Sequence, residues 1–204
     1  MKNNHKITDS QIKKLGNSKG IFINFPIYEY YNVPYPTKLS LENEKKYLSS
    51  LNTNENIDFI KEADNQLTYF NSELKKLGIN EDVVKNKNLK VLYNNIKPFI
   101  FELKFLYDRR RPNEVGVKDM VFLKSAQSPA YPSGHSTQSR FISLYLADKY
   151  PHKRREILAI GDRIGFSRIL ARVHYPSDHK FGKKLGTHLY VFYKNNTPFN
   201  ISNL

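Results

Sequence analysis

The chain has 204 residues, of which 39% are hydrophobic and 13% aromatic, which is enough for a folded domain with a sizeable core and too apolar for a disordered chain. It contains no Cys, which excludes disulfides, thiolate catalysis and Cys-ligated metal ions. The formal net charge of +14 favours anionic partners such as phosphoesters, nucleic acid or an acidic membrane surface. Because the Lys and Arg residues are scattered rather than gathered in one long run, binding to nucleic acid is not expected.

Residues 1–20 are polar and are expected to form a flexible N-terminus. They lack the apolar run of a secretory signal, and no stretch of the chain approaches 18 consecutive apolar residues, so no transmembrane helix is predicted. As given, the sequence predicts a soluble, cytoplasmic protein, or a periplasmic or secreted one if a leader has been removed. It leaves open contact with a membrane surface and assembly into a homo-oligomer.

Residues 21–36 are rich in Phe and Tyr and are interrupted by Pro26, Pro34 and Pro36. This composition predicts an extended segment packed over the helices. An aromatic wall for a substrate base, ring or acyl chain is the alternative. Packing is favoured, because amphipathic aromatic side chains commonly cover the edges of a core.

Two helices are predicted in the next part of the chain. Ser40 is the predicted N-cap of a short helix that ends near residue 51. Residues 54–77 have apolar side chains at helical spacing and are predicted to form one longer helix, ended by Gly78 at its C-cap.

A further helix is predicted over residues 88–110, with a kink at Pro98. It delivers Lys104, and Arg111 is expected at its end. Residues 114–129 have little periodicity and are predicted to be a loop long enough to line a pocket.

The C-terminal part predicts three helices, over residues 136–150, 153–173 and 178–193, the last with Ser177 as its N-cap. Residues 195–204 are polar and are expected to form a loose tail. With no alternating strand pattern, no internal repeat and no linker, the sequence predicts an all-α fold with a single helical domain over residues 21–194.

Three clusters of polar residues lie between residues 104 and 178. In the first, Lys104 and Arg111 are seven residues apart, which places both on one face of a helix. Pro112 breaks that helix, so Arg111 can reach into a cleft. Arg offers a planar fork for two phosphate oxygens and Lys a point charge. Taken alone, two cations on a helix face are more often simply solvated.

The second cluster is Pro132-Ser133-Gly134-His135, directly before a predicted helix. A Ser-Gly turn at a helix start directs free backbone N–H groups and the positive end of the dipole outward, which favours an anion. His135 would lie beside that anion. A Ser cap followed by an exposed His is the alternative when this cluster is read alone.

The third cluster consists of Ser167-Arg168, His174 and Asp178. Pro176 ends the preceding helix near His174 and folds the carboxylate of Asp178 back toward the imidazole. A carboxylate bonded to one ring nitrogen fixes the tautomer and leaves the other nitrogen free to attack or to take a proton. Favourable charge–dipole contacts at two helix ends are the alternative for His174 and Asp178.

In combination, the ordered pattern Lys-x6-Arg-Pro, Pro-Ser-Gly-His and Ser-Arg-x5-His-x3-Asp resembles the signature of the type-2 phosphatidic acid phosphatase and vanadium haloperoxidase superfamily, which includes soluble class A acid phosphatases. The resemblance covers roughly residues 100–185 and does not extend to the first ninety residues. It implies a helical bundle, in agreement with the fold class predicted from periodicity.

The resemblance also implies roles. His174 corresponds to a nucleophile that forms a phosphohistidine, Asp178 to its orienting partner, and His135 to the general acid that then activates water. The implied phosphate-binding residues are Lys104, Arg111, Ser133, Gly134 and Arg168. No metal ion or other cofactor is implied, because fixed cations and backbone donors neutralise the developing charge. An ordinary His pKa near 6.5 would suit both imidazole roles.

Four positions depart from the family pattern. Arg172 stands where members commonly have Gly, and Asn113 where the soluble acid phosphatases often have Phe. Arg109 and Arg110 add charge beside Arg111. The added arginines are expected either to narrow the substrate range toward more anionic groups or to face solvent.

The function predicted from the sequence is hydrolysis of a small anionic phosphomonoester, or of a lipid phosphate or diphosphate, by a soluble, metal-independent phosphatase. Two alternatives remain open: a haloperoxidase that uses vanadate as cofactor in the same cage, and a non-catalytic basic protein that binds anions. For a phosphatase, vanadate is expected to act as an inhibitor.

Overall fold

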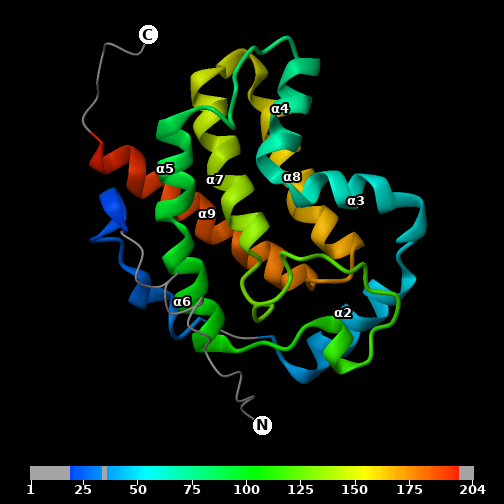
Figure 1. Cartoon of the computed structure of the whole chain (residues 1–204). Helices are drawn as coiled ribbons and strands as arrows, with labels where there is room; N and C mark the ends of the chain where they lie inside the picture. Colours follow the sequence, from blue (N-terminus) through cyan, green and yellow to red (C-terminus); the bar gives the residue numbers. More distant parts are fainter. Residues whose placement is uncertain (1–18, 34–35, 198–204) are drawn as a thin grey trace.

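The computed structural model describes residues 19–33 and 36–197 (Figure 1), and in them the chain is helical with no β-strand, which confirms the predicted all-α class. The helices are α2 (Lys38–Ser50), α3 (Ile57–Asp64), α4 (Gln66–Lys76), α5 (Lys87–Asn95), α6 (Lys97–Tyr107), α7 (Gly134–Lys149), α8 (Arg154–Leu170) and α9 (Pro176–Asn196). Short 3₁₀ turns η1 to η5 lie at Gly20–Phe22, Ile27–Tyr30, Asn54–Asn56, Pro112–Val115 and Pro151–Lys153.

Helix α7 lies at the centre of the fold between α8 and α9, with α5 and α6 on one side and α3 and α4 on the other (Figure 1). Most of the surface of α7 is buried, although several of its buried side chains are polar. Hydrogen bonds from their hydroxyl groups compensate for this, such as the bond from Ser139 to the carbonyl oxygen of Gly161 at 2.9 Å. Glycines permit the close approach of the neighbours: a Cβ on Gly182 of α9 would lie 2.7 Å from the carbonyl oxygen of Ser133. This contact fixes the start of α9 against the start of α7.

The aromatic segment before α2 packs into the core. Phe22, Phe25 and Tyr30 are buried against α6, α7 and α9, and Phe22 meets Phe141 edge to face at 5.8 Å between ring centroids. The predicted packing role is therefore right. The predicted extended conformation is only partly right, because the segment contains the 3₁₀ turns η1 and η2.

The single helix predicted over residues 54–77 is wrong. The structure has η3, α3 and α4, with a break at Asn65, whose φ of −93° and ψ of 77° are not helical. The Asn65 side chain accepts a hydrogen bond from the N–H of Thr68 and so begins α4. Gly78, at φ +75°, follows the C-cap as predicted.

The helix predicted over residues 88–110 is also wrong. It is two helices, α5 and α6, and Pro98 lies in the first turn of α6, where its missing N–H costs no hydrogen bond. Helix α6 ends at Tyr107 because Asp108 adopts a left-handed conformation with φ +43°. Arg111 therefore lies on extended backbone beyond the helix, and the predicted shared helix face with Lys104 does not exist.

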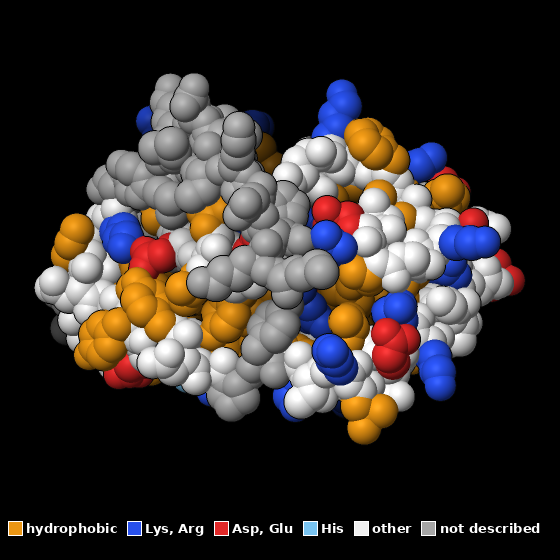
Figure 2. Space-filling view, turned by 90° about the horizontal axis from the view of Figure 1, so that it is seen from below, with side chains coloured by type: hydrophobic (Ala, Val, Ile, Leu, Met, Phe, Trp, Pro, Cys, Tyr) orange, Lys and Arg blue, Asp and Glu red, His pale blue; other side chains and the backbone are white. Residues whose placement is uncertain are grey.

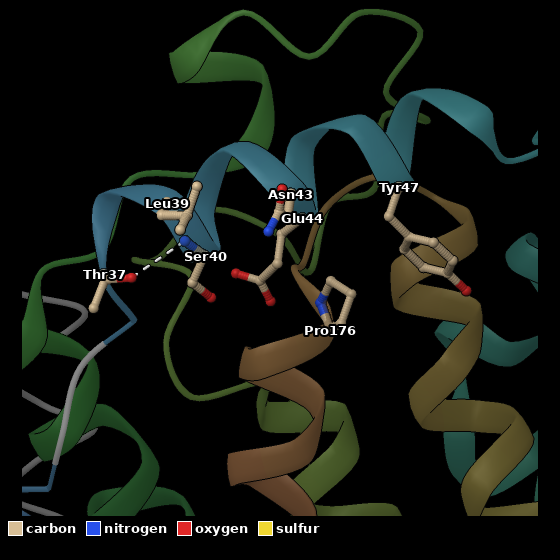
Figure 3. A pocket seen from close by; sticks show the side chains of 7 residues that line it. All are labelled: Thr37, Leu39, Ser40, Asn43, Glu44, Tyr47 and Pro176. Carbon is tan, nitrogen blue, oxygen red and sulfur yellow. Dashed lines mark hydrogen bonds between the residues drawn. The ribbon is translucent and has the colours of Figure 1, made fainter.

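Two predicted caps belong to other residues. Helix α2 begins after Thr37, whose hydroxyl accepts from the N–H of Ser40 at 3.2 Å (Figure 3), so Ser40 is inside the helix. Helix α9 begins after Tyr175 rather than at Ser177, because Asp178 accepts from the Tyr175 N–H at 2.9 Å.

The other predicted boundaries shift by a few residues. Helix α7 starts two residues early, α8 ends at Leu170 rather than near residue 173, and α9 continues into the predicted tail. The predicted flexible segment over residues 1–20 and the predicted loose tail over residues 195–204 fall largely on residues outside the described ranges. The single domain over residues 21–194 stays a prediction. None of the helices in the described part combines the length and apolar content that a membrane span requires.

Positive charge does not gather in one place on the face drawn in Figure 2. Lys and Arg side chains there lie scattered among acidic and apolar ones. This agrees with the dispersed Lys and Arg of the sequence.

Candidate active site

A cavity of about 210 Å³ lies where α6, the start of α7 and the end of α8 meet. Its wall contains most of the residues predicted for the site, together with aromatic, amide and hydroxyl side chains: Tyr93, Lys97, Ile100, Phe101, Lys104, Arg111, Ser125, Ser128, Gly134, His135, Gln138, Arg168 and His174. Ser125 and Ser128 come from the loop over residues 114–129, which therefore lines a pocket as predicted.

Lys104 and Arg111 reach the cavity from different pieces of backbone. The Nζ of Lys104 donates to the carbonyl oxygens of Pro129 and Ala130, which hold it at the cavity wall. Arg111 donates from Nε to the carbonyl oxygen of Ser128 at 2.9 Å and from Nη1 to that of Val173 at 2.6 Å. Backbone carbonyls thus orient both cations without neutralising them, which leaves their charge available to an anion.

Arg168 is the most deeply buried of the cations, with 1% of its surface exposed. Its Nη1 donates to Asp64 Oδ1 at 2.7 Å and its Nη2 to the hydroxyl of Ser125 at 2.8 Å. Within the described residues its Nε has no hydrogen-bond partner. Asp64 lies at the end of α3, and the break at Asn65 turns its carboxylate and its carbonyl toward the site.

The three cations destabilise one another. Burial, followed by the charge of Arg111, lowers the pKa of Lys104 well below its ordinary value, and Asp178 offsets part of that effect. Burial likewise lowers the pKa of Arg111 to about 10. Because like charges in a desolvated cavity raise each other's energy, an oxyanion bound among them is stabilised by all three at once. We call these three side chains the cation cage.

His174 and Asp178 lie together at the start of α9. The His174 Nδ1 is 3.0 Å from Asp178 Oδ2, and Asp178 has no exposed surface. A carboxylate can only accept, so Nδ1 carries the proton. The Nε2 of His174 then presents its lone pair 3.2 Å from Nη1 of Arg111, at the wall of the cavity.

The environment keeps the His174 imidazole neutral. Burial, followed by the charges of Arg111 and Lys104, lowers its pKa well below the ordinary value. Burial raises the pKa of Asp178, and the charge of Arg109 lowers it in part. A neutral imidazole with a fixed tautomer and an unprotonated Nε2 has the properties of a nucleophile once a bound oxyanion takes the Arg111 N–H that Nε2 accepts in this structure.

His135, in the first turn of α7, lies on the other side of the cavity. Its Nε2 is 3.0 Å from the carbonyl oxygen of Asp64. Burial and the charge of Arg168 lower its pKa to about 3, so the ordinary value near 6.5 assumed from the sequence is wrong for both His135 and His174. A phosphate dianion in the cage would raise the pKa of His135, because it places negative charge beside the ring.

Gly134 and Ser133 differ in position. Gly134 lines the cavity, and its N–H belongs to the first turn of α7, whose donors have no partner within the helix. Ser133 is fully buried at the N-cap, where its hydroxyl accepts from the N–H and the hydroxyl of Ser136. The structure therefore places the Ser133 side chain behind the cavity wall, and direct phosphate binding by it stays a prediction.

The arginines that depart from the family pattern have three different environments. Arg110 is exposed. Arg172 is buried and donates to the carbonyl oxygens of Lys118 and Leu51, so it neither borders the cavity nor faces solvent as predicted. Its φ of +55° explains why Gly suits this position. Arg109 is buried against Asp178.

Three residues at or behind the site were missed by the sequence reasoning: Glu44, Asp64 and Arg109. Glu44 and Asp64 lie before the motif region, and no spacing relates them to it. Arg109 was noticed only as an extra charge. No signal in the sequence separates Arg109 from its neighbours, because the three arginines are consecutive; in the structure Arg109 and Arg111 are buried and Arg110 is exposed.

The arrangement unites the cation cage, a neutral imidazole with an unprotonated Nε2, and a second imidazole across the cavity. These are the groups needed to hold a tetrahedral oxyanion, to attack it and to transfer a proton to or from the departing group. Among the described residues, no three His, Asp or Glu side chains are grouped as metal ligands.

Comparison with known proteins agrees with this arrangement. A non-specific acid phosphatase from Salmonella typhi is 33% identical over 57 residues, which cover 28% of this chain and 23% of that protein. One from Salmonella typhimurium is 26% identical over 97 residues, which cover 48% of this chain and 35% of that protein. The matched segments thus span about a third or less of these relatives. A family model of the PAP2 superfamily matches residues 82–201, more than half of the chain, and includes the cage, both imidazoles and Asp178. The chain therefore belongs to the PAP2 superfamily.

Proposed function

We propose that this protein is a phosphatase that hydrolyses small phosphomonoesters through a phosphohistidine at His174, without a metal ion. The observation that carries the proposal is the convergence of Lys104, Arg111 and Arg168 with the unprotonated Nε2 of His174 on one cavity of about 210 Å³. Superfamily membership and the two acid phosphatase relatives support the same chemistry.

The first step transfers the phosphoryl group to the protein. The cage holds the non-bridging oxygens, and the lone pair of His174 Nε2 forms a bond to phosphorus as the bond to the leaving oxygen breaks. A protonated His135 gives its proton to that oxygen, so the alcohol departs neutral. Positive charge that develops on the His174 ring is balanced by Asp178 at Nδ1.

The second step releases phosphate. His135, now unprotonated, takes a proton from a water molecule, whose oxygen attacks phosphorus as the bond to Nε2 breaks. The neutral His174 is restored with its proton still on Nδ1, where it is hydrogen-bonded to Asp178. The lowered pKa of His174 suits this cycle, because a ring that stays unprotonated keeps its lone pair available in mildly acidic solution.

Hydrolysis of p-nitrophenyl phosphate tests the proposal. We expect phosphate release that persists in the presence of EDTA and is inhibited by orthovanadate, a tetrahedral oxyanion that resembles phosphate and can accept a fifth ligand. Absence of hydrolysis with this and a panel of other phosphomonoesters and diphosphates would contradict it. Peroxide-dependent bromination of monochlorodimedone after vanadate loading would instead indicate a haloperoxidase.

A further inference from the structure

A buried ion pair lies behind the His174–Asp178 pair, on the side away from the cavity. Arg109 donates from Nη1 to Asp178 Oδ1 and from Nη2 to Glu44 Oε2, the latter at 2.8 Å. The exposed fractions are 4% for Arg109 and 9% for Glu44. The four side chains therefore form one continuous chain of contacts from α2 to the imidazole, with charges that alternate in sign up to the neutral ring.

Each member of this chain is held in place by further contacts. The guanidinium of Arg109 lies 3.9 Å from the centre of the Tyr175 ring and donates to the Ser177 hydroxyl at 2.6 Å. Glu44 accepts from the Ser177 N–H at 2.6 Å, which fixes it against the first turn of α9. Figure 3 shows Glu44 directed from α2 toward Pro176 at that end of α9.

Glu44 lies outside the part of the chain that the family model matches, and its partner Arg109 was identified above as a departure from the family pattern. Nothing in the proposed reaction needs either side chain to touch the substrate, since neither lines the cavity. Burying an arginine and two carboxylates costs free energy, and a purely structural contact could be replaced by apolar packing. The position of the pair next to Asp178 therefore suggests an electrostatic role.

We propose that Arg109 and Glu44 are positioning residues that act through Asp178 and set the pH range in which the His174 imidazole stays neutral. This inference rests on the proposed function. Arg109 compensates the carboxylate of Asp178, which would otherwise favour an imidazolium at His174. Glu44 in turn compensates Arg109, so the two residues act on the imidazole with opposite signs.

Other charged groups also face the His174 ring, and their effect on its pKa adds to that of Arg109 and Glu44. On the cavity side they are Lys104, Arg111, Arg168 and His135. All of these disfavour the imidazolium, and Asp64 offsets Arg168 at 2.7 Å. Substitution of Arg109 or Glu44 leaves this cavity side unchanged, so any change in the titration of His174 reports the buried pair alone.

The signs of the expected effects follow directly. Arg109→Gln removes a cation near His174, so the imidazolium is less disfavoured and the pKa of the ring rises. Glu44→Gln removes an anion, so that pKa falls. For one charge at this depth the change is on the order of one pH unit. A double substitution should return the ring close to its original titration.

The test is the pH titration of the His174 ring by NMR, assigned with a His174→Gln variant, alongside the acidic limb of kcat/KM for p-nitrophenyl phosphate. Arg109→Gln should move both to higher pH and Glu44→Gln both to lower pH. Arg110→Gln and Glu42→Gln are the matched controls, because they remove the same charges from exposed neighbours and should move neither.

Shifts that are absent, or that go in the same direction in both variants, would overturn the inference. If Arg109→Gln fails to fold, Arg109→Lys and Glu44→Gln together replace it in the test. Arg109→Lys keeps the positive charge, so the acidic limb of kcat/KM should stay at its original pH. If the unmodified protein hydrolyses no phosphoester, the proposed function fails, whereas the NMR titration still decides whether the buried pair controls the imidazole.

Discussion

The C-terminal helices α7 to α9 and the N-terminal helices α2 and α3 contribute different kinds of group to the same site. The C-terminal region holds His135, Arg168, His174 and Asp178, all within the segment that matches the PAP2 superfamily. The N-terminal region, outside that segment, holds Glu44 and Asp64, and each bonds to an arginine of the site. One region thus carries groups that touch the reacting atoms in the proposed reaction, and the other carries the counter-charges that hold them.

This difference shows what a small set of motif residues leaves unspecified. A buried cation loses hydration free energy, and it destabilises the fold unless hydrogen-bond acceptors compensate for that loss and orient it. The side chains of Lys104 and Arg111 are oriented by backbone carbonyl oxygens, which every sequence provides. Arg168 and Arg109 are oriented by carboxylates, which the sequence must encode. Asp64 and Glu44 lie outside the family segment, and Asp178, the second partner of Arg109, lies within it.

The largest effect is expected for His174→Ala. If His174 is the nucleophile, its loss should reduce turnover of p-nitrophenyl phosphate by about 10³-fold or more. Circular dichroism should show an unchanged helical content, because the ring contributes little to the core. Retention of more than a few per cent of the activity would remove His174 from this role.

Asp178→Asn should come next. The amide cannot serve as the charged acceptor for Nδ1, so the tautomer and the developing charge of His174 lose their support. We expect kcat to fall by roughly 10² to 10⁴-fold with little change in KM. Steady-state kinetics measures the two separately, and an unchanged kcat would show that Asp178 does not act through the imidazole.

Asp64→Asn tests the contribution of the N-terminal region. Arg168 would lose its charged acceptor and become free to rotate, and we expect kcat/KM to fall roughly tenfold. Asp58→Asn, on an exposed position of the same helix, is the control. Equal values for the two variants would mean that the counter-charge from α3 is dispensable.

The smallest effect concerns the stability of the C-terminal region. His179 of α9 lies 2.9 Å from the hydroxyl of Ser136 in α7, and burial lowers its pKa to about 4. Between pH 6.5 and 4 the unfolded chain binds the proton more strongly than the folded one, so the free energy of unfolding falls as the pH falls. For this half-buried ring the contribution across that interval is about 1 to 2 kcal/mol.

His179→Gln should therefore reduce the loss of stability between pH 7 and pH 4.5 by about 1 kcal/mol in urea unfolding. His152, exposed in η5, is the matched control, and His152→Gln should leave the pH dependence as it is. An identical pH dependence in both variants would show that His179 is protonated in the folded protein at pH 4.5.

The fold class could be predicted from the sequence, because helical periodicity is a local property. The gathering of most site residues in one cavity was implied by the family resemblance, and Ser133 and Asp178 do not line that cavity. The break at Asn65 could not, since the apolar spacing continues through it and only the Asn65 cap and its backbone angles mark it. The end of α6 at Asp108 was missed for a similar reason: nothing in the sequence requires that residue to adopt φ +43°.

The roles of the arginines depended on tertiary contacts. Arg172 was expected at the site or in solvent, yet it joins Leu51 and Lys118, which lie far from it in the sequence. Arg109 was expected to narrow the substrate range or to face solvent, and it lies instead behind Asp178. Long-range pairs of this kind leave no periodic trace in a single sequence.

The most direct measurement of the central claim is rapid acid-free quench of the protein during turnover of a ³²P-labelled phosphomonoester. The account predicts a base-stable, acid-labile phosphoenzyme whose label maps to the peptide containing His174, and no such label in His174→Ala. Turnover without any trapped phosphoenzyme under several quench conditions, or a label that persists in His174→Ala, would contradict it.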